Sequence, residues 1–217
     1  MKYSGKIHYS DQLQNPSDIV HLRWMKSLGL LETKGLNVLD LGCGSGYLCR
    51  RFSKENYGNI IGVDIELPVD HDKGDSGLQF LQIDLNEKDW IISLLRATGL
   101  ERFDLILAFD IVEHLNAPVE FLKNIRTLLS DSGSLVMTTP NTNSWERLVF
   151  SKTWSGAKDA GHLTLFNVYS LQFLLQRTGF FSIYLHARIN KLGLLASLFP
   201  DWGGQILSLS RKSQKKQ

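Results

Sequence analysis

The sequence predicts an α/β fold, a single-domain, Rossmann-like sheet of seven strands with helices on both faces. Strand and helix patterns alternate along the chain, which is typical of a mostly parallel sheet covered on both sides. An apolar strand at 38–41 runs into a glycine-rich turn and then a helix, which lets the backbone pass close to a bound ligand. The chain has 217 residues and no internal repeats, so one domain over 1–217 is expected.

The elements can be justified in order along the chain. Pro16 suits the first turn of a helix, and the helix is expected to reach about Leu31 because apolar residues recur on one face. That face consists of Ile19, Leu22, Met25 and Leu28. Strands are predicted at 37–41, 59–64, 78–83, 103–109, 134–139, 181–188 and 205–210. Helices are predicted from 47 and at 89–98, 118–130 and 168–178, the last ended by Gly179. Proline, glycines and acidic residues make 66–77 a poor helix.

The glycine turn indicates which kind of ligand is bound. Gly42, Gly44 and Gly46 stand at every second position, whereas a dinucleotide fingerprint requires its third glycine three residues after the second. Asp40 lies two residues before the first glycine, where a carboxylate would repel a pyrophosphate and favour a cationic amine or sulfonium. The pattern therefore argues against a nicotinamide dinucleotide. A purely structural turn in another α/β protein is the alternative.

Residues 38–46, Val-Leu-Asp-Leu-Gly-Cys-Gly-Ser-Gly, resemble the cofactor loop of class I S-adenosylmethionine-dependent methyltransferases. Further stretches at 103–115, 133–141, 161–166 and 178–180 are similar to the branch that contains ubiquinone-biosynthesis O-methyltransferases and sugar- and natural-product-tailoring enzymes. The resemblance implies S-adenosyl-L-methionine as cofactor, the strand order 3-2-1-4-5-7-6 and an antiparallel last strand. It also implies a helix at 66–77, which the composition of that segment disfavours.

Further cofactor contacts are expected where strands end. Asp64 ends the second strand, where a carboxylate can accept both ribose hydroxyls; a turn-forming role is the alternative. The resemblance implies that Asp84 receives the adenine amino group and that the N–H of Leu85 meets a ring nitrogen; Asp84 can instead cap the next helix. Phe109, at the end of the fourth strand, completes the expected cofactor contacts.

The expected catalytic residues lie in two segments. Methyl transfer is a direct displacement, so an enzyme has to align the nucleophile and can also remove its proton. Glu113 and His114 follow strand 103–109, and His162 lies where the resembled family builds its substrate wall; histidine suits proton removal near neutral pH. Capping or packing remains the alternative for both histidines. Three nearby aromatic residues can form either core or a substrate platform: Trp145, Trp154 and Phe166.

A divalent metal is the alternative to a metal-free histidine base. Asp110, Glu113 and His114 form Asp-x-x-Glu-His, and a similar pattern with a distant histidine, here His162, coordinates a divalent ion in some relatives. Such an ion would bind a diol or catechol and acidify the attacking hydroxyl. Asp110 is shorter than the Glu typical of the first position, so we expect no metal and a base at His114 or His162.

Composition limits the partners and the location. The net charge is +2, with much of the basic excess in 211–216, so nucleic acid is not expected. The two cysteines show no metal or disulfide spacing, no apolar run reaches membrane-spanning length, and a cytoplasmic location is predicted. Residues 1–32 are expected to form a helical lid. The apolar insertion at 189–203 packs on the domain, covers a lipophilic substrate or contacts a membrane surface.

Together these features predict an enzyme that O-methylates a small-molecule hydroxyl in a biosynthetic pathway. The alternatives are N- or C-methylation of a peptide or metabolite, or a catalytically silent cofactor-binding subunit of a partner. The sequence does not define the acceptor or the oligomeric state.

Overall fold

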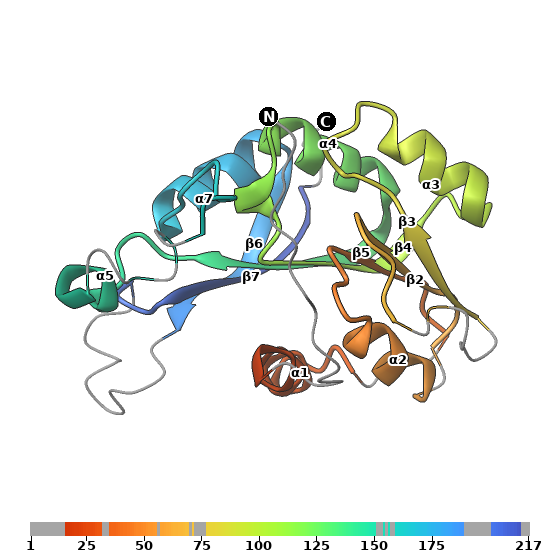
Figure 1. The fold of residues 1–217 in the computed structure, drawn as a ribbon, viewed down its shortest axis with the longest axis horizontal. Helices are drawn as coiled ribbons and strands as arrows, with labels where there is room; N and C mark the ends of the chain where they lie inside the picture. Colours follow the sequence, from red (N-terminus) through yellow and green to blue (C-terminus); the bar gives the residue numbers. More distant parts are fainter. Residues whose placement is uncertain are drawn as a thin grey trace. The chain divides into compact units, whose positions relative to one another are not determined.

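The computed structural model describes residues 16–31, 35–55, 57–69, 71, 77–150, 154, 156, 159–188 and 201–213. Its first elements are α1 (Pro16–Ser27), β1 (Val38–Leu41), α2 (Tyr47–Ser53), β2 (Ile60–Asp64), β3 (Leu78–Gln82), α3 (Trp90–Thr98) and β4 (Phe103–Phe109). They are followed by the 3-10 turn η1 (Val112–His114), α4 (Pro118–Leu128), β5 (Leu129–Pro140), α5 (Trp145–Phe150), α7 (Val168–Arg177), β6 (Phe180–Arg188) and β7 (Gln205–Lys212) (Figure 1). The strands form one seven-stranded sheet in the order β3-β2-β1-β4-β5-β7-β6, which confirms the predicted topology.

The chain divides after Leu105 into two compact units. In the first unit, β1 pairs with β2 and β2 with β3, all in parallel. Every residue of β1 is buried, because α2 lies on one side of these strands and α3 on the other (Figure 1). Continuous apolar strands of this kind are typical of parallel sheets covered on both faces. Phe52 of α2 is fully buried and its ring lies 5.0 Å from that of Tyr57.

The second unit, from Ile106 onward, contains the antiparallel part of the sheet. β7 pairs antiparallel with both β5 and β6, so the predicted antiparallel last strand is confirmed. α7 packs against β6 through a buried face that includes Leu171 and Leu175. Asn167 caps this helix: its side chain accepts a hydrogen bond from the N–H of Ser170, and the Ser170 hydroxyl accepts one from the N–H of Asn167.

Three element predictions need correction. β5 begins at Leu129 instead of 134, because Asp131 to Gly133, read as a break, is extended and Lys212 of β7 reaches the Asp131 carboxylate at 3.2 Å. α1 ends at Ser27, and its described buried residues are His21, Trp24 and Met25, whereas Leu22 and Leu28 are half-buried. α5 was not predicted.

Some predictions fall partly or wholly outside the described residues. No helix occurs at 65–69 or 71, in agreement with the composition of 66–77, while 70 and 72–76 lie outside the described part. The same holds for residues 1–15 and 32 of the expected lid, 189–200 of the apolar insertion and 214–217 of the basic tail. Among the helices that the structure describes, none is long and apolar enough to cross a membrane.

Candidate functional site

The glycine turn after β1 is folded by its own backbone. Gly42, Gly44 and Gly46 have φ values of 80°, 52° and 73°, in the left-handed region that favours glycine. The N–H groups of Gly42 and Cys43 donate to the carbonyl of Val63 at 2.8 and 3.0 Å. Side chains at the three glycine positions would therefore strain the turn, which explains the spacing seen in the sequence.

Asp64 orders this turn from the end of β2. One carboxylate oxygen accepts a hydrogen bond from the N–H of Gly44 at 2.8 Å, and the other accepts one from the N–H of Glu66 at 3.4 Å. Burial raises the pKa of Asp64. Asp64, the residue predicted to bind the ribose, therefore also positions the loop that precedes α2.

Asp40 lies deeper than the sequence pattern suggests. It is 2% exposed, and its carboxylate accepts a hydrogen bond from the Cys49 thiol at 3.3 Å. The hydrogen bond with Cys43 and burial raise the pKa of the Cys49 thiol well above its usual range. Asp40 thus lies beneath the turn, against the first turn of α2, and not at an open mouth.

A cavity of about 310 Å³ lies at the carboxyl ends of β2 and β3, where open α/β sheets bind ligands. Its lining residues are Ile65, Gln82, Ile83, Asp84, Glu87 and Ser93. Asp84 accepts a hydrogen bond from the N–H of Asn86 at 2.8 Å through one oxygen, which stabilises the turn after β3. It does not cap the next helix, because α3 begins at Trp90 and its N-cap is Asp89. The second oxygen of Asp84 is compatible with the predicted adenine contact, and Leu85 follows it as a half-buried residue.

In the second unit, β4 ends at the half-buried Phe109, and the chain turns sharply at Asp110. Asp110 has a φ of 49°, which is uncommon for a residue with a side chain. Its carboxylate accepts hydrogen bonds from Thr138 Oγ1 at 3.0 Å and from Gln205 Nε2 at 2.9 and 2.8 Å. These bonds hold the strained turn that leads into η1, and they occupy the side chain predicted as the first metal ligand.

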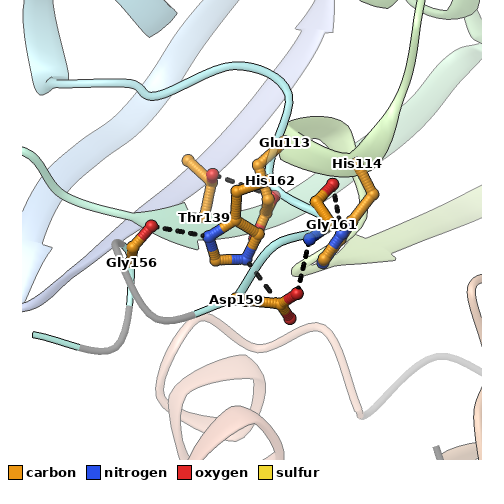
Figure 2. A network of polar contacts seen from close by, with 7 residues as sticks. All are labelled: Glu113, His114, Thr139, Gly156, Asp159, Gly161 and His162. Carbon is orange, nitrogen blue, oxygen red and sulfur yellow. Dashed lines mark hydrogen bonds and ion pairs between the residues drawn. The ribbon is translucent and has the colours of Figure 1, made fainter. Parts of the chain in front are cut away.

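Glu113 occupies a buried position beneath this turn. It is 1% exposed; Oε2 accepts a hydrogen bond from Thr139 Oγ1 at 2.9 Å, and Oε1 is buried with no hydrogen-bond partner among the described residues (Figure 2). Burial, followed by the negative charge of Asp110, raises the pKa of Glu113 to about 8. A buried carboxylate without a counter-charge is costly, so this position favours a proton or a cation.

The two predicted histidines lie beside Glu113. The rings of His114 and His162 are 4.6 Å apart, and one ligand atom from each lies within 4.8 Å of the other and of a Glu113 oxygen. Nδ1 of His114 contacts the carbonyl of Gly161 at 3.1 Å, and Nδ1 of His162 contacts that of Gly156 at 2.9 Å (Figure 2). Because a carbonyl only accepts hydrogen bonds, Nδ1 carries a proton in both rings, and in the neutral form of each ring the lone pair is on Nε2.

The surroundings keep these imidazoles in place. Burial, followed by the charge of His162, lowers the pKa of His114, which favours the neutral ring. A Cβ at Gly156 would collide with the indole of Trp154, so glycine is required where this carbonyl receives His162. Trp154 and Phe166 are buried, which assigns them to the core, while Trp145 is half-buried.

The structure thus brings together Glu113, His114 and His162, and it directs Asp110 toward Gln205 and Thr138 instead. Sequence reasoning did not single out Thr139, the hydrogen-bond donor to Glu113. The available signal was the pair of threonines, Thr138 and Thr139, at the buried, carboxyl-terminal part of an otherwise apolar stretch of β5.

Comparisons with known proteins agree with this description. A family model described as a methyltransferase domain matches residues 14–184. Ubiquinone biosynthesis O-methyltransferases from Rhodopseudomonas palustris and Coxiella burnetii are 32% and 36% identical, over 54% and 52% of this chain. The aligned parts are 44% and 47% of those proteins, so the chain spans about half the length of the curated relatives it matches.

Solved structures share the fold. An S-adenosylmethionine-dependent methyltransferase from Mesorhizobium loti superposes with a TM-score of 0.67 at 19% identity, over 92% of this chain and all of that one. A 1,6-didemethyltoxoflavin-N1-methyltransferase from Burkholderia thailandensis, with bound 1,6-didemethyltoxoflavin and S-adenosylhomocysteine, gives 0.61 at 17% identity, over 94% and 80%. The family match covers most of the chain and confirms the predicted enzyme class and its cofactor, S-adenosyl-L-methionine: this chain belongs to the methyltransferase-domain family.

Proposed function

We propose that this methyltransferase transfers the methyl group to a hydroxyl of a small molecule. The cofactor supplies an electrophilic methyl carbon, so the chain has to bind it, align the acceptor and take up the hydroxyl proton. Support for cofactor binding comes from the glycine turn, Asp64 and the cavity beside Asp84. Support for a hydroxyl acceptor comes from the Glu113, His114 and His162 cluster and from relatives named as O-methyltransferases.

The cluster fits a divalent cation, and this fit is the observation on which the proposal mainly rests. Oε1 of Glu113 is buried and unpaired among the described residues, and the Nε2 atoms of both histidines carry lone pairs. Histidines that bind metals usually donate their other N–H to a carbonyl or carboxylate, as both do here. We therefore infer that Glu113, His114 and His162 hold a divalent ion such as Mn²⁺, Fe²⁺ or Zn²⁺, which would acidify the acceptor hydroxyl.

Chelation tests this proposal. Treating the purified protein with a chelator should reduce transfer of labelled methyl from S-adenosylmethionine into an extract of small metabolites at least tenfold, and added Mn²⁺ should restore it. Full activity in the chelated sample, with an inactive His114→Ala variant, would instead leave His114 as a metal-free base. Absence of label transfer under every condition would favour the silent partner subunit.

The labelled products also identify the acceptor atom. Methyl ethers or esters among them support O-methylation, whereas N-methyl or C-methyl products support the alternative enzyme class. The identity of the labelled metabolite then provides the substrate for quantitative kinetics.

A further inference from the structure

The cation site described above contains one carboxylate, that of Glu113, so a divalent ion bound there would keep a net positive charge unless a second carboxylate lies nearby. The sequence pattern offers Asp110 as the second. The structure places it elsewhere: both oxygens of Asp110 accept hydrogen bonds from Gln205, and one also accepts a hydrogen bond from Thr138. Freeing Asp110 would break these bonds at a strained position, so Asp110 is not available as a second carboxylate.

Asp159 lies on the histidine side of the cluster (Figure 2). Its Oδ2 is 3.9 Å from Nε2 of His162, the ring nitrogen that the bond to Gly156 leaves with a lone pair. The Asp159 side chain is 40% exposed, whereas the His162 side chain is 9% exposed. Asp159 therefore lies on the open side of the site.

Gly161 fixes the orientation of this carboxylate. Its N–H donates to Oδ1 of Asp159 at 2.8 Å, and its carbonyl receives Nδ1 of His114 at 3.1 Å. A single residue thus positions two side chains of the cluster, as outer-shell partners of metal ligands do. Oδ1 is occupied by this bond, and Oδ2 is the oxygen that remains on the side of His162.

We propose that Asp159 supplies the second carboxylate of the cation site, beside Glu113, His114 and His162. This inference rests on the proposed function, because it requires that the site holds a cation. The set balances the charge of a divalent ion and offers two carboxylates and two imidazoles, a combination that suits Mn²⁺, Fe²⁺ or Zn²⁺. Asp110 is then a positioning residue for the turn and not a ligand.

The test is a titration of the full chain with Mn²⁺. Binding is measured as the loss of the free-ion signal in electron paramagnetic resonance. Wild type should bind one Mn²⁺. Asp159→Asn should raise its Kd about 10- to 100-fold, because the substituted side chain keeps the bond to Gly161 but loses the charge. Asp159→Ala should weaken binding at least as much. The matched control Glu120→Gln, on an exposed carboxylate of the same unit, should change the Kd less than threefold. Asp110→Asn, at the turn beside the cluster, should weaken binding less than Asp159→Asn.

Each of the other possible results contradicts either the assignment of Asp159 or the cation site itself. Wild-type affinity in Asp159→Asn with loss only in Asp159→Ala would show that Asp159 merely caps Gly161. Loss in Asp110→Asn with retention in Asp159→Asn would return the ligand role to Asp110. No Mn²⁺ or Zn²⁺ binding by wild type would overturn the cation site itself, and the assignment of Asp159 with it. Melting temperatures of each variant exclude loss of fold as the cause.

Discussion

Glu113→Gln is expected to raise the melting temperature of the metal-free protein at pH 8 by roughly 6–20 °C. The pKa of Glu113 is raised in the folded state to about 8, from 4.5, mainly by burial. Ionisation of a carboxyl whose pKa is raised in the folded state lowers the free energy of unfolding. This destabilisation is absent below about pH 4.5, grows as the pH rises, and is nearly complete at about pH 8. It amounts to roughly 3–5 kcal/mol, and each kcal/mol shifts the melting temperature of a domain of this size by about 2–4 °C.

The glutamine side chain of this variant would carry no charge at any pH and could still accept the hydrogen bond from Thr139. Thermal melts of wild type and variant should therefore agree near pH 5 and diverge as the pH rises to 8. Glu120, whose side chain is 64% exposed, provides the control: Glu120→Gln should follow the wild-type curve. Parallel curves for wild type and Glu113→Gln across this range would contradict the burial of an uncompensated carboxylate.

Glu113→Gln also tests whether a cation stabilises the folded protein. Saturating Mn²⁺ should stabilise the wild type at pH 8, because ligands that bind only the folded state shift unfolding by mass action. It should stabilise Glu113→Gln far less. A variant that is more stable without metal and less responsive to it distinguishes a functional carboxylate from an ordinary core residue.

Asp64→Ala is expected to weaken binding of S-adenosylhomocysteine by roughly 2–4 kcal/mol, about 30- to 1,000-fold in Kd. Two charge-assisted hydrogen bonds to the ribose would be lost, together with the bond from Gly44 that orders the glycine turn. Because burial raises the pKa of this carboxyl, removing it should cost the fold little. Isothermal titration calorimetry measures the change directly.

Two further variants separate the two roles of Asp64. Asp64→Asn keeps an acceptor for the N–H of Gly44 and should lose less affinity than the alanine variant. Glu66→Ala, on an exposed neighbour, should leave the Kd unchanged. An unchanged Kd in Asp64→Ala would mean that the ribose binds elsewhere. Nicotinamide dinucleotides should give no heat with any of these proteins.

Local chemistry was readable from the sequence and the strand order from the resemblance, whereas individual side-chain contacts between distant strands were not. Glycine spacing predicted the turn after β1, because only glycine adopts those φ values without strain. The pattern at 110–114 with His162 identified the side chains that converge in the second unit. The pattern could not show that Gln205 takes the Asp110 carboxylate, since that contact depends on β7 pairing with β5.

Element boundaries show the same limit. Asp131, Ser132 and Gly133 are residue types that favour turns, yet they lie within β5, where Asp131 contacts Lys212 near the end of the chain. In α1, apolar periodicity selected Leu22 and Leu28, but the buried face includes His21 and Trp24. Histidine and tryptophan combine a large ring with polar ring nitrogens, so apolar periodicity does not predict whether they face the core.

Asn141, just after β5, holds the segment that leads into β7. Its side-chain amide donates to the carbonyls of Asp201 and Gly203, each at 2.7 Å, and its N–H donates to the carbonyl of Gly204 at 3.0 Å. The start of β7 is thereby fixed to the end of β5 by bonds that do not involve the stretch at 189–200, which precedes it in the sequence. Sequence changes between β6 and β7 can therefore accumulate without resetting the register of β7 against β5.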